Sequence, residues 1–544
     1  MIIMKKAIRL VNSKITYYLF TALVFVTVFC LLGERGYLLW KDSPAYLAFD
    51  GRTGIVPVYP ILLQVNRMIF GEESFLYAVV AEQTILTVIC ILAFTEFIRK
   101  RFRLSYLASY PVLLFSIFMP FTTNYPLSIS NHDIMTEALA YPIFYLYMIC
   151  FLKCIFDKKY KDIVLMVLMS VILALIRTQL QLVGVFNAAA FIYISWMKGR
   201  KYPIGRQLVR GVCYVLLSAM VLLAGEIVIL GANSAGQRLI AAMNRELAVK
   251  EMVMSEEEKP EEKEVIESEV EAEPEEKEVI EPEEETKEEL DLAEGMKMQP
   301  ETSSAASANP SGSNVTDQYG HLLIDKAVYE IDEDDYLLFE DEELQKLCKE
   351  IYEESDEKHQ RYVYARDDLW MWQDIMDGIA SGTAIAGAAW DKYLAENPDT
   401  ELTYSAVNQI AAVLLMEHLG RAIYHTLRMM PQGFICTVFF QKEGIYLLCH
   451  LITLLIYVSA TLLVVWGYRR KDLENQYPEF LLGCIVINVC FVLIQSVMFF
   501  AMQRYLVYCF GIFYAAYYLI LKEAVRRLWL SRKKYDILSK NEGK

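Results

Sequence analysis

The sequence predicts an all-α polytopic membrane protein with about 10 transmembrane helices and a helical insertion on the extracytoplasmic side. Its 544 residues are 55% hydrophobic and have a mean hydropathy of +0.28, which is too apolar for a soluble chain of this length. Apolar runs long enough to cross a bilayer recur along most of the chain. Lys and Arg clusters also flank these runs on alternate ends, as expected when a chain threads back and forth through a membrane.

Ten segments carry this apolar pattern. The two on either side of Arg177 are short, so counts of nine or eleven spans also fit the roughly 20 residues that a crossing requires. The segments are residues 15–33, 75–98, 104–121, 137–155, 162–176, 179–197, 211–231, 445–467, 479–500 and 505–522.

The basic loops predict the orientation. Arg99–Arg101, Lys158 with Lys159, residues 198–206, residues 469–471 and residues 526–534 all fall on one side of the predicted membrane. Positive loops stay in the cytoplasm, so that side is predicted to be cytoplasmic. The protein is then expected in the plasma membrane as a multi-pass protein, with both termini cytoplasmic and residues 232–444 extracytoplasmic.

Four regions follow from these patterns. The formal net charge of −16 comes from one of them, because residues 251–300 hold 22 acidic residues against 5 Lys. Such a segment has few apolar groups to bury and is expected to be disordered. The regions are residues 1–231, an N-terminal transmembrane core with outer catalytic loops; 232–318, an acidic disordered extracytoplasmic linker; 319–444, a small helical extracytoplasmic subdomain; and 445–544, the C-terminal transmembrane helices and cytoplasmic tail.

Several classes of protein are excluded by missing patterns. The sequence has no basic stripe that would bind nucleic acid, and most of its 11 Cys lie in apolar spans with no disulfide framework. Its 6 His contain no HExxH or HxH ligand spacing, which argues against a dedicated zinc site. It also lacks the GxSxG, Walker and GxGxxG motifs of serine hydrolases, ATP-driven pumps and Rossmann-type nucleotide-sugar enzymes.

The first outer loop is longer than a simple connection needs, which favours a functional role. Asp42 precedes Ser43 and Pro44, and either Asp42 or Ser43 could cap a short helix while Asp42 also serves as a general base. Tyr46 follows in the same segment. Residues 58–70 have the apolar spacing of a helix lying in the membrane interface, with Tyr59 at the depth of the headgroups.

The second outer loop places His132, Asp133 and Glu137 directly ahead of the fourth span. Asp133 or Thr136 could cap that span, and Glu137 could simply favour its positive N-terminal end. Carboxylates from two neighbouring outer loops also suit chemistry in which a hydroxyl loses its proton as it attacks.

Two arginines lie on the outer side, where positive charge is disfavoured. Arg177 stands between the fifth and sixth spans, and Arg504 precedes the last span. One interpretation is that both side chains reach to the interface from helix ends. The other is that their forked guanidinium groups hold the phosphate of a lipid-linked donor.

Taken together, these residues resemble the GT-C class of integral-membrane glycosyltransferases, especially bacterial family-39-like members related to protein O-mannosyltransferases and aminoarabinose transferases. The resemblance covers roughly residues 1–231 and 430–525. The usual Asp-Glu pair of the first loop is Asp42-Ser43 here, so a second carboxylate has to come from elsewhere. The matching segments are Asp42-Ser-Pro-Ala-Tyr46, Pro57-Val-Tyr-Pro60, Thr136-Glu-Ala-Leu-Ala-Tyr-Pro142, Arg177 and Gln503-Arg504-Tyr505.

The resemblance implies transfer of a sugar from a polyprenyl-phosphate donor to an extracytoplasmic acceptor, which would be a glycan, a lipid or a protein, by direct displacement with inversion. It implies Asp42 as the general base or as the carboxylate that orients the acceptor, and Asp133 or Glu137 as a ligand of the acceptor or of an optional divalent cation. No cofactor is certain from it. Arg177 and Arg504 would bind the donor phosphate. The implied substrate contacts are Tyr46, Tyr59, His132, Gln503 and Tyr505.

Three other interpretations remain open. A surface-polysaccharide polymerase or ligase would depend on the outer arginines and not on Asp42. A transporter or flippase of lipid-linked sugars would show paired half-repeats or Gly/Pro-broken helices, and the sequence has no clear internal repeat. A non-catalytic scaffold would only display residues 320–430 outside the membrane.

Overall fold

The computed structural model describes residues 2–33, 36–40, 43–48, 56–118, 131–199, scattered residues between 203 and 245, and residues 316–364, 382–438, 446–498 and 506–542. Within these ranges the chain is helical, apart from one isolated parallel bridge between Leu38 and Asp133. The predicted linker, 232–318, lies almost entirely outside the described residues, as do Asp42, Gln503, Arg504 and Tyr505.

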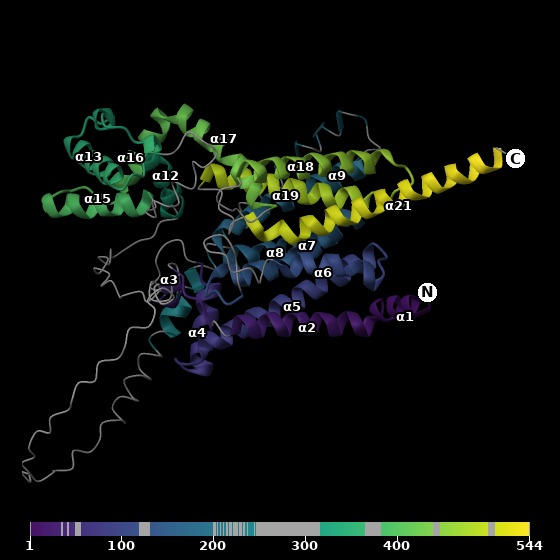
Figure 1. The fold of residues 1–544 in the computed structure, drawn as a ribbon. Coiled ribbons are helices and arrows are strands. Elements are labelled where there is room, and N and C mark those ends of the chain that lie inside the picture. Colours follow the sequence, from purple (N-terminus) through teal and green to yellow (C-terminus); the bar gives the residue numbers. More distant parts are fainter. Residues whose placement is uncertain are drawn as a thin grey trace, which may run out of the picture. The chain divides into compact units, whose positions relative to one another are not determined.

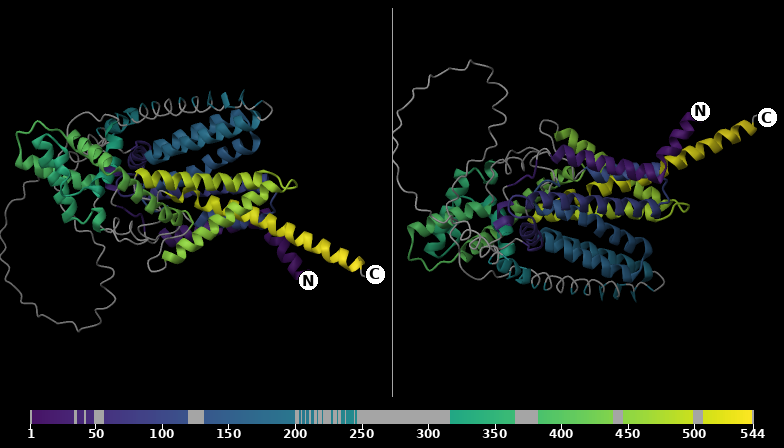
Figure 2. Two further views of the ribbon diagram at one scale, coloured as in Figure 1. Left: turned by 90° about the horizontal axis from the view of Figure 1, so that it is seen from above. Right: turned by 90° about the horizontal axis from the view of Figure 1, so that it is seen from below.

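The protein is a helical membrane protein. In the part of the chain that the structure describes, five helices are long and apolar enough to cross a bilayer: Phe75–Arg101, Thr136–Asp157, Gln179–Met197, Leu447–Arg469 and Gln476–Val497. The membrane-type helices run side by side in the views of Figures 1 and 2. They are α2 (Lys14–Gly33), α5 (Phe75–Arg101), α6 (Tyr106–Phe118), α7 (Thr136–Asp157), α8 (Tyr160–Ile176), α9 (Val183–Gly199), α18 (Tyr446–Arg469), α19 (Gln476–Met498) and α21 (Phe510–Glu542).

These helices cover nine of the ten predicted spans. The tenth, 211–231, falls mostly outside the described residues. Helices α6 and α8 have 13 and 17 residues, fewer than the roughly 20 that a full crossing takes. The count of ten spans therefore stays a prediction, although the apolar runs located the helices correctly.

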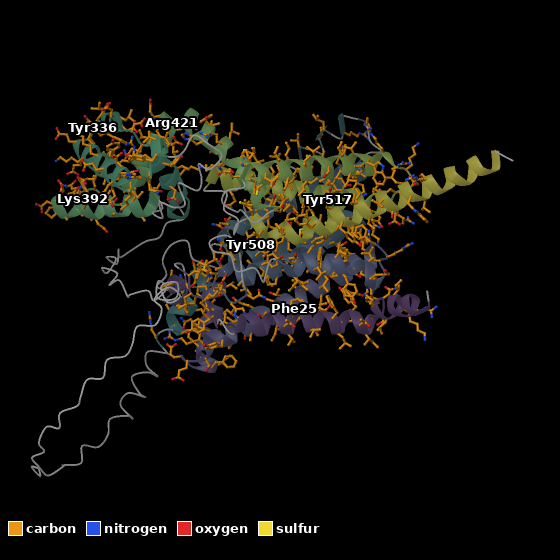
Figure 3. All side chains as sticks on the ribbon, in the orientation of Figure 1. Phe25, Tyr336, Lys392, Arg421, Tyr508 and Tyr517 are labelled. Carbon is orange, nitrogen blue, oxygen red and sulfur yellow. The ribbon has the colours of Figure 1, made fainter. Side chains whose placement is uncertain are left out.

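Helix α7 lies at the centre of the bundle and packs against α5, α8, α9 and α19. It is apolar on all sides, as expected for a helix surrounded by other helices, and its Phe144, Tyr145 and Tyr147 are fully buried. Buried hydroxyls find partners nearby: Tyr147 OH donates to Asn187 Oδ1 over 3.2 Å, and the Tyr141 and Tyr145 hydroxyls are 2.9 Å apart. Side chains fill the space between the helices, as Figure 3 shows around Tyr508 and Tyr517.

One end of the bundle carries the basic loops. There the Leu107 N–H donates to Asn12 Oδ1 over 3.0 Å, which ties the N-terminal segment to the start of α6. Arg101 pairs with Asp157 at 2.8 Å and joins α5 to α7, while Arg527 of α21 pairs with Asp472. The loops at this end are therefore held by cross-helix ion pairs, and the site described below lies at the opposite ends of α5 and α7.

A further group of helices lies between α9 and α18 in the described part of the chain. It contains α12 (Thr316–Glu330), η2 (Asp335–Leu338), α13 (Glu342–Glu357), η3 (Tyr362–Tyr364), α15 (Gly382–Glu396), α16 (Ser405–Glu417) and α17 (Leu419–Cys436), here called the insertion. Asp341 caps α13 by accepting from the Glu343 and Leu344 backbone N–H groups. Leu347, Ile385 and Ile410 lie in its own apolar core. Lys326 Nζ donates to the Ser496 carbonyl over 2.9 Å and so fastens α12 to the end of α19.

Candidate functional site

Two loop segments that the sequence assigns to the outer side are joined through their backbones. The Leu38 N–H donates to the His132 carbonyl over 2.8 Å, and the Ile134 N–H donates to the Leu38 carbonyl over 3.0 Å. The Ser43 hydroxyl, at the start of α3 (Ser43–Ala48), donates to the Ile134 carbonyl over 2.9 Å and accepts from the Trp40 N–H. The two loops are thus fixed together next to the position of Asp42 in the chain.

Gln83 of α5 links this loop pair to a third segment. Its side-chain Nε2 donates to the carbonyls of Asn131 and Asp133 over 2.9 and 3.3 Å. Its Oε1 accepts from the Tyr59 hydroxyl of α4 (Val58–Phe70) over 3.0 Å. A buried amide in a spanning helix therefore sets the position of both Tyr59 and the loop that carries Asp133.

His132 is held in one tautomer. Its Nδ1 lies 2.7 Å from the Gly36 carbonyl oxygen, which can only accept, so Nδ1 carries the proton. Burial lowers the pKa of His132 below its ordinary value of 6.5, while the Gly36 carbonyl acts in the opposite direction. The ring is therefore neutral at pH 7 and its Nε2 carries the lone pair.

Glu137 and Arg177 form a buried ion pair between the first turn of α7 and the end of α8. Arg177 Nη1 also donates to the Thr136 hydroxyl over 2.8 Å, and that hydroxyl donates to Glu137 Oε2 over 3.0 Å. Arg177 Nε donates to Gln179 Oε1 over 2.8 Å. The guanidinium is consequently fixed in orientation by three side chains.

The two tyrosines lie beside these charges. The Tyr46 and Tyr59 rings meet edge to face with their centroids 5.7 Å apart. Burial raises the pKa of Tyr59 well above its usual range, and the nearby Tyr46, Glu137 and Asp133 raise it further. The Tyr59 hydroxyl therefore stays protonated at neutral pH and serves as the hydrogen-bond donor to Gln83.

The structure thus brings together six of the ten side chains singled out in the sequence: Tyr46, Tyr59, His132, Asp133, Glu137 and Arg177. The sequence did not predict the Glu137–Arg177 pair or the part played by Gln83. A polar amide within the apolar run 75–98 was the available signal, because such residues in a span need a partner. Within the described ranges, no group of three or more His, Cys, Asp or Glu side chains is arranged to hold a metal ion.

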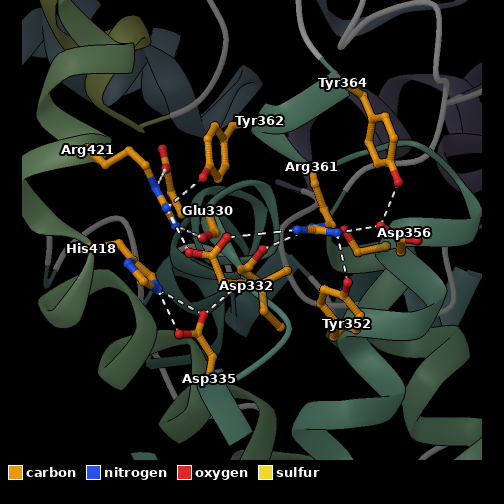
Figure 4. A network of polar contacts seen from close by, with 12 residues as sticks. Glu330, Asp332, Asp335, Tyr352, Asp356, Arg361, Tyr362, Tyr364, His418 and Arg421 are labelled. Carbon is orange, nitrogen blue, oxygen red and sulfur yellow. Dashed lines mark hydrogen bonds and ion pairs between the residues drawn. The ribbon is translucent and has the colours of Figure 1, made fainter.

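A second polar network, which no sequence motif predicts, lies in the insertion (Figure 4). Buried Glu330, at the end of α12, accepts from Arg421 Nε over 2.9 Å and lies 2.7 Å from His425 Nδ1. Arg421 also donates to Asp332 over 2.8 Å and lies over the Tyr362 ring, with its Cζ 4.0 Å from the centroid. These contacts fix α17 to α12.

The same network extends to α13. Arg361 donates to the Tyr352 hydroxyl over 3.0 Å and pairs with Asp356, which also accepts from the Tyr364 hydroxyl over 2.6 Å. The Tyr364 hydrogen bond and the Arg361 charge hold the pKa of the half-buried Asp356 carboxyl below its usual range. His418 lies 2.8 Å from Asp335. Together these contacts hold α12, α13 and α17 in a fixed relation, and the network is called the clamp below.

Comparisons with known proteins find no matching family model, no matching curated protein and no matching solved structure. The resemblance to GT-C glycosyltransferases therefore stays a prediction drawn from the residues themselves.

Proposed function

We propose that the protein is a membrane glycosyltransferase that moves a sugar from a polyprenyl-phosphate donor to an acceptor outside the cytoplasm. The proposal includes about ten spans in the plasma membrane, both termini in the cytoplasm and the insertion on the outer side. The acceptor hydroxyl attacks the anomeric carbon, the bond from that carbon to the phosphate oxygen breaks with inversion, and polyprenyl phosphate leaves.

The main observation in favour of this proposal is a buried cluster of ionisable side chains where the bundle meets its loops. Asp133, Glu137 and Arg177 are each less than a tenth exposed. Burying charge in a membrane protein is costly, so such groups usually mark a substrate or ion site. The cluster also combines a carboxylate for the acceptor proton with a cation for the phosphate charge, the two groups that this displacement needs.

Asp133 and Asp42 are the proposed carboxylates for the acceptor. The backbone bridge between Leu38 and residues 132–134 holds the Asp133 loop against the segment that leads into Asp42. His132 is a neighbouring neutral base. Its Nε2 offers a second acceptor for a hydroxyl proton, and the Gly36 contact keeps that nitrogen unprotonated.

Arg177 and Arg504 are the proposed phosphate ligands. Arg177 uses Nε and Nη1 for Gln179, Thr136 and Glu137, so these partners preset the plane of its guanidinium. A preset fork loses little freedom when it binds phosphate oxygens. The insertion is proposed to help bind the acceptor.

The test is transfer of label from a radiolabelled polyprenyl-phosphate sugar by purified protein in proteoliposomes. Asp133→Asn removes one charge and leaves the backbone contacts of residues 131–134 in place, and Asp42→Asn tests the second carboxylate. Asp162→Asn is the matched control. Asp162 is also buried, but it lies in the first turn of α8, away from the cluster, and pairs with Lys153 of α7.

Loss of the general base is expected to slow sugar transfer by about 10²–10⁴-fold. Asp133→Asn, Asp42→Asn or both should show this loss at normal expression and thermal stability, while Asp162→Asn transfers at the wild-type rate. Unchanged transfer in the double Asp42→Asn, Asp133→Asn variant would remove the catalytic assignment and favour a polymerase or ligase that depends on the arginines.

A further inference from the structure

Helix α17, Leu419–Cys436, has two faces of different character. His425, Met429, Gln432 and Cys436 recur every three to four residues and are buried. At its N-terminal half this face meets the clamp around Glu330, and at its C-terminal half it joins the apolar core of the spanning helices. The helix therefore belongs to the insertion at one end and to the membrane bundle at the other.

The opposite face is an apolar stripe. Leu419, Ile423 and Leu427, each four residues apart, are between 48% and 59% exposed. Further along the same side, Met430 and Phe434 pack against the core of the spanning helices. Three large apolar side chains in a row on an exposed helix face would be unfavourable in water.

Contacts at the end of α17 fix its depth. The Phe434 ring lies edge to face with Tyr457 of α18, with the centroids 5.2 Å apart, and the Thr437 and Tyr457 hydroxyl oxygens are 2.7 Å apart. Tyr457 is near the middle of the 24-residue α18. At 1.5 Å per residue it lies about 16 Å below Tyr446, close to half the thickness of a bilayer core.

Two other helices contact the same region. Tyr457 OH accepts from Asn488 Nδ2 over 3.0 Å, and Asn488 is near the middle of α19. Tyr514 OH of α21 donates to the Val438 carbonyl over 2.5 Å, just past the end of α17. Contacts with α18 and α21 thus place the C-terminal end of α17 among the spanning helices, and the position of Tyr457 within α18 sets its depth.

We propose that α17 is a re-entrant helix that dips into the leaflet next to the insertion, with its apolar stripe in contact with lipid acyl chains. Leu427 lies seven residues before Phe434, hence about 10 Å nearer the surface along the helix, and Leu419 lies about 22 Å nearer. The stripe therefore runs from the hydrocarbon into the interface. Tyr424 and Arg428 flank it, with the guanidinium 5.7 Å from the ring centroid, as suits the headgroup region.

Lipid is the occupant that the surroundings favour. Helix α18, which packs against α17, presents Leu447, Leu451 and Leu454, each at least half exposed, on a candidate span of which only 22% is buried inside the protein. The stripe continues this lipid-facing surface, and none of its own positions from Leu419 to Phe434 carries a charged side chain. A face that met water or a polar partner would need polar side chains among these positions.

The test is the depth of spin labels in proteoliposomes of phosphatidylcholine and phosphatidylglycerol. Single Cys residues replace Leu419, Ile423 or Leu427 of the full-length protein, with the exposed Cys213 changed to Ser. Leu337→Cys is the matched control, because Leu337 is 64% exposed on η2 of the same insertion and lies outside the stripe. Power saturation compares collisions with oxygen, which enriches in lipid, and with a water-soluble nickel chelate.

We expect the ratio of oxygen to nickel accessibility to rise in the order Leu337, Leu419, Ile423 and Leu427, with Leu427 shifted furthest toward oxygen. Labels at 423 and 427 that collide with nickel as often as the label at 337 would overturn the proposal. So would labels hidden from both reagents, since these would place a second copy or another protein on the stripe.

Discussion

At the scale of single residues, the Glu137–Arg177 pair is the most demanding feature of the molecule. Their side chains are 2% and 9% exposed. Two charges removed from water are tolerated only while they satisfy each other, and removal of one partner leaves the other uncompensated. The pair should therefore be both a strong structural joint between α7 and α8 and a pre-oriented cation for the proposed donor.

Glu137→Gln and Arg177→Met should each destabilise the protein by about 3–5 kcal/mol, because each leaves a buried charge alone. The double variant should recover part of that loss. Thermal unfolding in detergent measures both effects, and Lys392→Met, which breaks the half-exposed pair with Glu350, is the control expected to change little. Additive losses in the double variant would show that the two side chains are not coupled.

His132 should make the stability depend on pH. Burial lowers its pKa, so between the ordinary value of 6.5 and the lowered value the unfolded chain binds a proton that the native protein does not. Stability from this group is complete above pH 6.5 and declines as the pH falls below it. His132→Asn keeps a donor for the Gly36 carbonyl but does not titrate, so its melting temperature should fall less between pH 7 and about pH 5. Parallel melting curves for both proteins would contradict the assignment.

At the scale of elements, α21 approaches α6 and α7 through Gly511. A Cβ at this position would lie 2.5 Å from the Phe115 carbonyl oxygen and 2.6 Å from the Tyr145 hydroxyl. Small residues at such points let spanning helices pack closely, and here the backbone of α6 cannot give way easily.

Gly511→Ala should therefore cost about 1–3 kcal/mol, the usual range for overpacking. Gly483→Ala is the control, since its Cβ would meet only Phe151 at an ordinary 3.4 Å. Thermal stability in the same detergent is the readout. Equal stability of the two variants would mean that α21 can move away from α6 at no cost.

The elements also show what the sequence could predict. Continuous apolar runs located α5, α7 and α19, because a spanning helix can be recognised from the length and the composition of its apolar run. The path of α17 was not predictable in this way. Arg421, Arg428, Pro431 and Gln432 interrupt its apolar pattern, and only contacts with Tyr457 reveal where it ends.

The residues of the candidate site were also predictable only in part. Loop position and residue type identified Asp133, Glu137 and Arg177, but local pattern carries no distances, so the ion pair across 40 positions was not foreseen. The clamp in the insertion joins residues about 90 positions apart, Glu330 with Arg421 and His425, and has no sequence motif at all.

At the scale of the whole molecule, a membrane bundle holds a cluster of charges where two of its loops meet, and the insertion is tied to that bundle twice. Lys326 anchors α12 to the end of α19, a few residues before Gln503 and Arg504, and α17 enters the core beside α18. This arrangement would let acceptor binding on the insertion affect the proposed phosphate ligands. It also gives the clamp a role. The clamp keeps α12 and α17, the two helices that contact the bundle, in a fixed relation to each other.

The most direct measurement uses the purified wild-type protein in sealed vesicles with a labelled polyprenyl-phosphate sugar in the outer leaflet only, and follows label in donor, acceptor and vesicle lumen. The account predicts that label leaves the donor for an acceptor on the donor's own side, with release of polyprenyl phosphate, and that the Asp42→Asn, Asp133→Asn double variant fails to do this. Intact labelled donor appearing in the inner leaflet, or label that stays on the donor for every sugar and acceptor supplied, would contradict it.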